Sequence, residues 1–180
     1  MKKTLIFLLI VILSPLIAGM YGVLHDQITY SISEEYYTEF KFIQFGIADY
    51  FWDRFGASIV GFMATWWFGL ILGIVIGAVG FVHKTSKRMF LVSMQAIFIN
   101  LVIALFIGLT GLLYGYIKWG SVTRENLPNW RIPDSVVDFN SFIMVGSMHN
   151  FSYLGGVLGL ILAIIWQIRN RKISTIIKNV

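Results

Sequence analysis

Four long runs of uncharged, mostly apolar residues divide the chain, and polar residues collect between them. The runs cover residues 4–24, 55–82, 89–117 and 139–168, the last interrupted only by His149. A helix rises 1.5 Å per residue, so about 20 residues cross the roughly 30 Å hydrocarbon core of a bilayer. The pattern predicts an all-α membrane protein with four transmembrane helices in a single membrane domain, residues 1–180.

We place these helices at about residues 4–30, 57–82, 89–117 and 140–168, with outer segments at about 31–56 and 118–139. For the first run, a cleaved signal peptide is the alternative. The apolar region of a signal peptide is shorter, and Ala18-Gly19-Met20 is not an A-x-A cleavage site, so we favour an uncleaved helix.

Composition supports a membrane protein. Hydrophobic residues make up 57% of the chain and charged residues 13%, against roughly one half and one quarter in soluble domains. There is no cysteine, which excludes disulfides and thiolate metal sites. Any metal ion would need histidine, carboxylate or backbone oxygen ligands.

The basic residues are distributed unequally between the two sides of the predicted membrane domain. One side carries nine of the fourteen, namely Lys2, Lys3, Lys84, Lys87, Arg88, Arg169, Arg171, Lys172 and Lys178. The other side carries Lys41, Arg54, Lys118, Arg124 and Arg131, together with every Asp and Glu. Since basic residues stay in the cytoplasm, we expect both termini to be cytoplasmic, in the cytoplasmic membrane. With no basic soluble domain, we expect no nucleic-acid partner.

Two stretches of the first half resemble two stretches of the second half. GMYGVLHDQITY (19–30) matches GLTGLLYGYIKW (108–119), and VGFMATWW (60–67) matches VGSMHNFS (145–152). Both copies begin on the same side of the membrane. The pattern therefore predicts a four-helix bundle of two tandem helical hairpins, related by an axis along the membrane normal.

Glycines recur at spacings of three or four in the later helices, as in Gly69, Gly73 and Gly77. Small residues let backbones approach closely, so we expect intramolecular helix packing rather than a homodimer seam. We also expect Trp66 and Trp67 to pack in the core, since they lie too deep for an interfacial belt. His83, in the basic loop, is expected to be a solvated surface residue.

The segment before the second helix contains too many aromatic residues for a free loop. Ser31 with Glu34, or Ser33 alone, can start a short helix that runs to about Phe45 on the outer mouth of the bundle. Alternation of apolar residues around Tyr30 and Phe40 also permits short strands. We favour the helix, which makes this a structured extracytoplasmic segment.

Polar residues that are costly in lipid collect near the outer side. His25 and Asp26 lie a turn or two before the outer end of the first helix, and His149 and Asn150 lie at a comparable depth in the fourth. An ionisable residue inside a membrane is a functional-site hypothesis by default. We therefore predict an outward-facing polar pocket, capped by acidic residues of the outer segment. Its ligand-binding residues would be His25, Asp26, Glu35, Glu39, His149 and Asn150.

Two imidazoles and nearby carboxylates can hold a transition-metal ion, and His25 and His149 are the candidate ligands. Haem between the same histidines is a further alternative. The spacing is no known ligand signature, so a structural role stays open: His25 bonded to Asp26 or water, and His149 satisfied by Asn150, Ser147 or the outer segment.

The stretch HDQITYSISEEYYTEFKFIQFG (25–46), the VGFMATWW helix and GSMHNFSYLGG (146–156) together resemble an uncharacterised group of bacterial four-helix integral membrane proteins. The resemblance covers nearly the whole chain. It implies the membrane topology and brings no assigned activity.

For function we expect a binding or accessory membrane protein, present as a homo-oligomer or in a larger membrane assembly. A metal- or haem-dependent membrane enzyme that uses His25 and His149 is the alternative, and whether the protein is an enzyme stays open. A small transporter is a third hypothesis, weakened because the inner half offers few polar residues for a conduction path.

Overall fold

The computed structural model describes residues 2–126 and 132–176. These residues are almost entirely helical, and they contain no β-strand. Four helices are long: α1 (Lys3–Ile32), α3 (Arg54–Gly80), α4 (Ser86–Trp119) and α5 (Phe139–Ile176). Short turns of helix lie between them: η1 (Tyr37–Lys41), α2 (Phe42–Phe45), η2 (Asp49–Phe51) and η3 (Arg124–Asn126).

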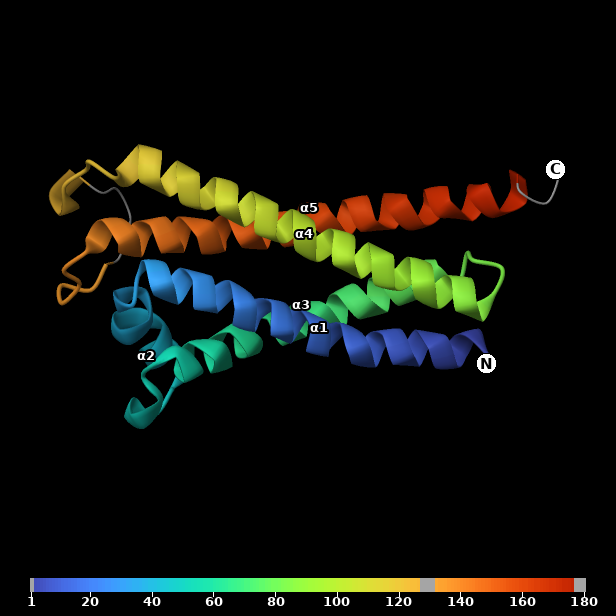
Figure 1. Cartoon of the computed structure of the whole chain (residues 1–180), viewed down its shortest axis with the longest axis horizontal. Coiled ribbons are helices and arrows are strands. Elements are labelled where there is room, and N and C mark those ends of the chain that lie inside the picture. The colour runs from blue at the N-terminus through green and yellow to red at the C-terminus, as the bar shows by residue number, and fades with distance from the viewer. Residues whose placement is uncertain (1, 127–131, 177–180) are drawn as a thin grey trace.

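The four long helices run along the long axis of the molecule (Figure 1). All four are long and apolar enough to cross a membrane, which confirms the prediction of an all-helical, multi-pass membrane protein. The start of α1 and the end of α5 lie at one end, which we call the terminal end. The segments that connect α1 to α3 and α4 to α5 lie at the other, which we call the cap end.

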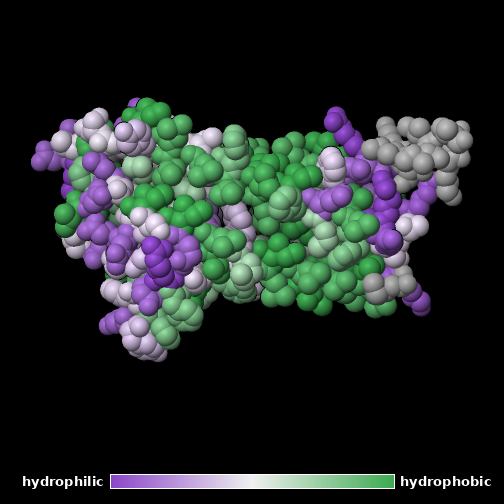
Figure 2. All heavy atoms as spheres, in the orientation of Figure 1, coloured by the Kyte–Doolittle hydropathy of each residue, from purple (hydrophilic) through white to green (hydrophobic). Residues whose placement is uncertain are grey.

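Large apolar side chains cover the outer surface of these helices, including Leu24, Phe98 and Phe106. In Figure 2 they form a broad hydrophobic band between two ends that carry the hydrophilic residues. A surface of this kind is stable in lipid rather than in water. Arg131, Trp130 and Lys178, and the side chain of Lys172, lie outside the described residues.

Side chains cap the long helices that follow a loop. Asp53 Oδ1 accepts hydrogen bonds from the backbone N–H groups of Phe55 and Gly56 at the start of α3. Thr85 Oγ1 accepts one from Arg88 N–H at the start of α4. Each cap satisfies donors that a helix start leaves unpaired.

Helix α1 packs most extensively along α3, and α4 along α5. At the α1–α3 crossing Gly22 faces Gly61, and a Cβ at either glycine would overlap the other's carbonyl oxygen. On the other pair, a Cβ at Gly155 would lie 2.9 Å from the Cα of Ala104. These glycines therefore serve close packing within the chain, as expected.

Residues 33–53, which we call the cap segment, form a compact structure over the cap end. Ser33 Oγ accepts a hydrogen bond from Tyr36 N–H, so Ser33 alone starts the helical turns that continue through η1 and α2. Gly46 then ends them in the left-handed conformation, with φ 63°. The strand alternative for this segment is wrong.

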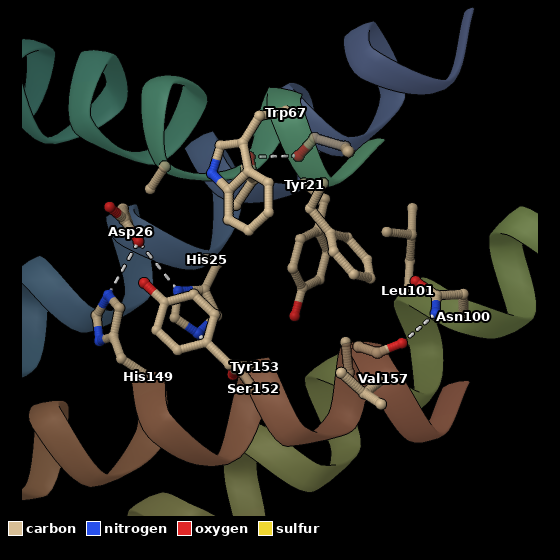
Figure 3. Close-up of a pocket in the computed structure, with 16 residues that line it drawn as sticks. Tyr21, His25, Asp26, Trp67, Asn100, Leu101, His149, Ser152, Tyr153 and Val157 are labelled. Atoms are coloured by element: carbon tan, nitrogen blue, oxygen red, sulfur yellow. Dashed lines mark hydrogen bonds and ion pairs between the residues drawn. The ribbon is translucent and has the colours of Figure 1, made fainter. Parts of the chain in front are cut away.

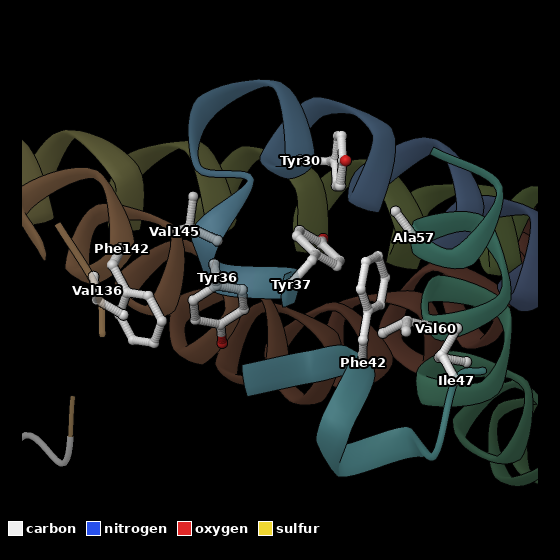
Figure 4. Close-up of a cluster of buried hydrophobic side chains, with 10 residues drawn as sticks. All are labelled: Tyr30, Tyr36, Tyr37, Phe42, Ile47, Ala57, Val60, Val136, Phe142 and Val145. Atoms are coloured by element: carbon white, nitrogen blue, oxygen red, sulfur yellow. The ribbon is translucent and has the colours of Figure 1, made fainter. Parts of the chain in front are cut away.

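Aromatic residues of the cap segment form the core of the cap end (Figure 4). Tyr37 and Phe42 are fully buried, and Tyr36 packs on Phe142 at 5.0 Å between ring centroids. The cluster contains Tyr30, Tyr36, Tyr37, Phe42, Ile47, Ala57, Val60, Val136, Phe142 and Val145. It joins the cap segment to the first turns of α5.

Two expectations from the sequence are wrong. His83 is 1% exposed and lies under the basic turn between α3 and α4, where burial and the charges of Arg88 and Lys3 lower its pKa. Trp66 and Trp67 are 43% and 48% exposed, so neither is buried in the core, although Trp67 borders an interhelical pocket. His83 was assigned from its place in a basic loop, and the tryptophans from their depth, which carries no information about rotation.

Candidate functional site

A pocket of about 370 Å³ lies between α1, α3, α4 and α5, inside the apolar band (Figure 3). Its volume falls within the range of small-molecule sites, about 300–1,000 Å³. The lining comes from all four long helices: Ala18, Tyr21, His25, Asp26, Ala64, Thr65, Trp67, Phe68, Asn100, Leu101, Ala104, His149, Ser152, Tyr153, Gly156 and Val157. Most of the polar lining residues gather at one end of the pocket, and most of the remaining lining is apolar.

A carboxylate and two imidazoles form the polar end of the pocket, and we call them the His–Asp–His cluster. Asp26 Oδ1 lies 3.0 Å from His25 Nδ1 and 3.4 Å from His149 Nε2. The imidazole centroids are 4.9 Å apart, edge to face. All three side chains are buried, at 5%, 3% and 7% exposure for His25, Asp26 and His149.

Each imidazole is held through its other nitrogen. His149 Nδ1 lies 2.9 Å from the backbone oxygen of Val145, which only accepts, so this nitrogen carries a proton. His25 Nε2 lies 3.1 Å from Ser152 Oγ. As a result His25 Nδ1 and His149 Nε2 both face Asp26. Outer hydrogen bonds of this kind orient metal-ligating histidines.

Groups of the cap segment cover the cluster. Tyr36 stacks on His149 with ring centroids 5.0 Å apart, and burial raises the pKa of its phenol, which keeps it neutral. The Tyr37 hydroxyl donates to the backbone oxygen of Asp26 and lies 2.5 Å from Thr29 Oγ1. These contacts fix the end of α1 that presents His25 and Asp26.

The remainder of the pocket is apolar, with Phe68, Leu101 and Ala104 along its walls. Asn100 lines it on α4 and donates through Nδ2 to the backbone oxygen of Gly156, at 2.7 Å. The site thus combines one polar end with a hydrophobic body, an arrangement typical of small-molecule pockets.

Three of the six predicted site residues come together, and three do not. His25, Asp26 and His149 form the cluster, whereas Asn150 is exposed and does not line the pocket. Glu35 accepts hydrogen bonds from the N–H groups of Val137 and Asp138. Glu39 bonds Ser135 Oγ. The two glutamates therefore dock the cap segment on the segment before α5 instead of entering the pocket.

No family model, curated protein or solved structure matches the chain. The similarity to bacterial four-helix membrane proteins gains no support from these comparisons. The site must be interpreted from its own geometry.

Sequence reasoning missed Tyr21, Tyr36, Ser152 and Tyr153. Helical spacing contains a signal for two of them, because Tyr21 precedes His25 by four residues and Ser152 follows His149 by three. Both spacings place the pair on one helix face. Tyr36 gave no such signal, because its position depends on how the cap segment folds back.

Two of the three ligand-atom separations in the cluster match those of a tetrahedral transition-metal site. Tetrahedral coordination with bonds of about 2.0–2.1 Å separates neighbouring ligand atoms by about 3.3 Å. The observed separations from Asp26 Oδ1 are 3.0 and 3.4 Å, and all three ligand atoms lie within 4.8 Å of one another. A haem between the two imidazoles does not fit, because both inner nitrogens point at Asp26 and leave no room for a macrocycle.

Proposed function

We propose that this protein binds one divalent transition-metal ion in the membrane, held by His25, Asp26 and His149. The observation that carries the proposal is the direction of the imidazoles. His149 Nδ1 is occupied by a backbone carbonyl, so a neutral ring would turn the lone pair of Nε2 toward a carboxylate 3.4 Å away. That contact is repulsive unless a cation or a second proton lies between them.

The ligand set supports a metal in two further ways. Two imidazoles and one carboxylate suit zinc, iron, manganese or copper. Asp26 Oδ2 is buried and has no hydrogen-bond partner among the described residues, so it can serve as a second ligand oxygen. Three protein ligands would leave a coordination position for a molecule in the pocket, as catalytic metal sites do. A metal-dependent membrane enzyme is the activity this would allow.

A metal-free binding or accessory role is the second candidate. His25 Nδ1 and His149 Nε2 are both within ion-pair distance of Asp26 Oδ1, so an imidazolium on His149 would pair with the carboxylate. The cluster would then be a buried ion pair that orders the cap end. A transporter is less supported, because Gln167 bonds Ser93 and Asn100 bonds Gly156 at the positions a polar path would need.

Elemental analysis of untagged protein purified without chelators separates the two candidates. We expect about one transition-metal ion per chain, with loss of that ion in His149→Ala and in His25→Ala. Asn150→Ala is the matched control, because Asn150 is the next residue of α5 and is exposed. Wild-type protein that contains none of zinc, iron, manganese and copper at about one ion per chain contradicts the metal proposal. A loss of thermal stability in His149→Ala without any metal would then support the ion pair.

We also propose that the terminal end is cytoplasmic and the cap end extracytoplasmic, in a bacterial cytoplasmic membrane. The basic residues gathered at the terminal end support this orientation. Because the chain has no cysteine, Lys84→Cys and Glu125→Cys each report one side. In intact cells, a membrane-impermeant maleimide should label Glu125→Cys alone. Labelling of Lys84→Cys alone would show that the protein has the opposite orientation.

The two tandem hairpins stay a proposal as well. Matched glycines support them: Gly22 packs against Gly61 between α1 and α3, and Gly111 packs against Phe151 between α4 and α5. If the halves are true repeats, residues 1–83 and 84–180 expressed as two chains should assemble. Failure of the two purified halves to associate in detergent, when each is soluble, would count against it.

A further inference from the structure

The pocket opens sideways, between α3 and α5. Trp67 on α3 and Tyr153 and Val157 on α5 line it, yet these side chains are 48%, 50% and 54% exposed. Figure 3 shows Trp67 on one wall and Tyr153 and Val157 on the opposite wall. The opening lies within the apolar band, where the surroundings are lipid chains.

The other directions are blocked by packed residues. Toward the cap end, Tyr36 and Phe142 lie over the His–Asp–His cluster and are 5% and 3% exposed. Toward the terminal end, a buried aliphatic cluster fills the space between the helices, with Leu72 and Ile76 fully buried. Among the described residues, the route into the pocket is therefore from the bilayer rather than from water.

The polar end carries hydroxyl groups that face the pocket. The Tyr21 hydroxyl is buried near Ser152, and no described residue forms a hydrogen bond with it in good geometry. Ser152, whose Oγ lies 3.1 Å from His25 Nε2, and Tyr153 add two more hydroxyl-bearing side chains to the pocket lining. A buried hydroxyl without a partner costs about 1–3 kcal/mol, which a ligand oxygen would recover.

We propose that the pocket binds a lipid-soluble molecule with one neutral oxygen head group, an alcohol or a ketone, that enters from the bilayer between α3 and α5. The head group lies among Tyr21, Ser152 and the cluster, and the apolar body lies along Phe68, Leu101 and Val157. In the metal-free cluster, the Asp26 carboxylate disfavours an anionic head. This inference goes beyond the proposed metal site, since it rests on the pocket and its side opening.

The test is photolabelling of the full chain in liposomes with a long-chain alcohol that carries a diazirine. A diazirine alkane of equal length, without the hydroxyl, is the comparison probe. Labelled residues are identified by peptide mass spectrometry. We expect the alcohol to concentrate on Phe68 and Leu101, and the alkane to label lipid-facing residues such as Leu70 and Ile161.

Two variants fill the pocket, and each has a matched control. Ala64→Phe fills it from α3, and Ala78→Phe adds the same bulk on the exposed face of that helix. Val157→Trp narrows the opening, and Ile161→Trp is its control one turn along α5. We expect both filling variants to reduce alcohol labelling about tenfold, which corresponds to about 1.4 kcal/mol, and both controls to keep it.

The experiment is run with metal-loaded and chelator-treated protein, which separates the two proposals. Focused labelling in either form supports the pocket, even if no metal binds. Labelling that spreads over lipid-facing residues, or that persists in both filling variants when these remain monodisperse, overturns it. Stoichiometric metal together with unfocused labelling would leave the metal site standing and remove the lipid-soluble ligand.

Discussion

Helix α3 meets α1 and α5 in opposite ways. Against α1 it packs backbone to backbone through Gly61 and Gly22, with no room for even a methyl group. Against α5 its closest approach at a glycine is looser, where a Cβ at Gly156 would lie 3.2 Å from Phe68 Cζ. Small residues pull membrane helices together by dispersion, and helices without them stay apart. The pocket lies where that attraction is missing.

The internal sequence similarity adds a chemical difference to this contrast. It pairs Ala64 of α3 with His149 of α5, and the same offset continued by one residue pairs Phe68 with Tyr153. All four residues line the pocket. One wall is therefore apolar and the other polar at matched positions. Function, in our proposals, depends on the difference between the two walls rather than on what they share.

The largest expected effect comes from breaking the tight contact. Gly22→Leu should prevent α1 from packing on α3, because the new side chain overlaps the Gly61 carbonyl, and backbone cannot move aside as a side chain can. We expect loss of monodisperse protein in detergent. Gly156→Ala is the control and should stay folded, since only the Phe68 ring has to shift. Equal yields of the two variants would contradict the contrast.

A smaller effect should follow from changing the polar wall alone. Ser152→Ala removes the hydroxyl that holds His25 Nε2 and should weaken metal binding about 10- to 100-fold, as loss of an outer partner does. Phe68→Leu, on the apolar wall, should leave the metal affinity unchanged. Competition with a metal-sensitive dye measures both. Equal affinities in Ser152→Ala and wild type would show that this bond does not orient the ring.

The smallest effect is expected at the bond that ties α4 to α5 beside the pocket. Asn100→Leu removes the hydrogen bond to the Gly156 backbone, and such bonds in membranes average about 0.6 kcal/mol. The buried Oδ1 of Asn100 has no hydrogen-bond partner among the described residues, so the substitution also removes an unsatisfied acceptor. The net change in unfolding free energy should therefore be under about 1 kcal/mol. Steric trapping or denaturation by sodium dodecyl sulfate can measure it. A loss of several kcal/mol would mean that α5 depends on this bond.

The sequence predicted the helices well because hydropathy is a local property. Four apolar runs became four long helices, and Ser33 was one of two starts proposed for the cap segment helix. Similar depth in the membrane also led us to consider His25 together with His149. Depth says nothing about rotation, however. Asn150, one residue beyond His149 and about 100° around the helix, is exposed.

The sequence did not predict which residues of the cap segment contact the pocket, because their positions depend on how that segment folds. Glu35 and Glu39 were expected over the pocket, but they bind the segment before α5, which lies about 100 residues away in the chain. Tyr36 instead reaches His149. Glu35 and Tyr36 are adjacent in a helical turn and point about 100° apart, so the rotation of that turn decides which of them faces the pocket.

The hydrogen-bonded group at the outer flank of α1 and α3 has one more consequence. Gln27 bonds the Arg54 carbonyl and Ser58, and the Arg54 guanidinium reaches Ser31, so polar groups tie α1 to α3 at this level. Gln27 is two residues past His25, about 3 Å along the helix axis. In the orientation proposed above, the ionisable residues would sit near the outer edge of the hydrocarbon layer, and a proton or a hydrated ion would have only the layer of Tyr36 and Tyr37 to cross.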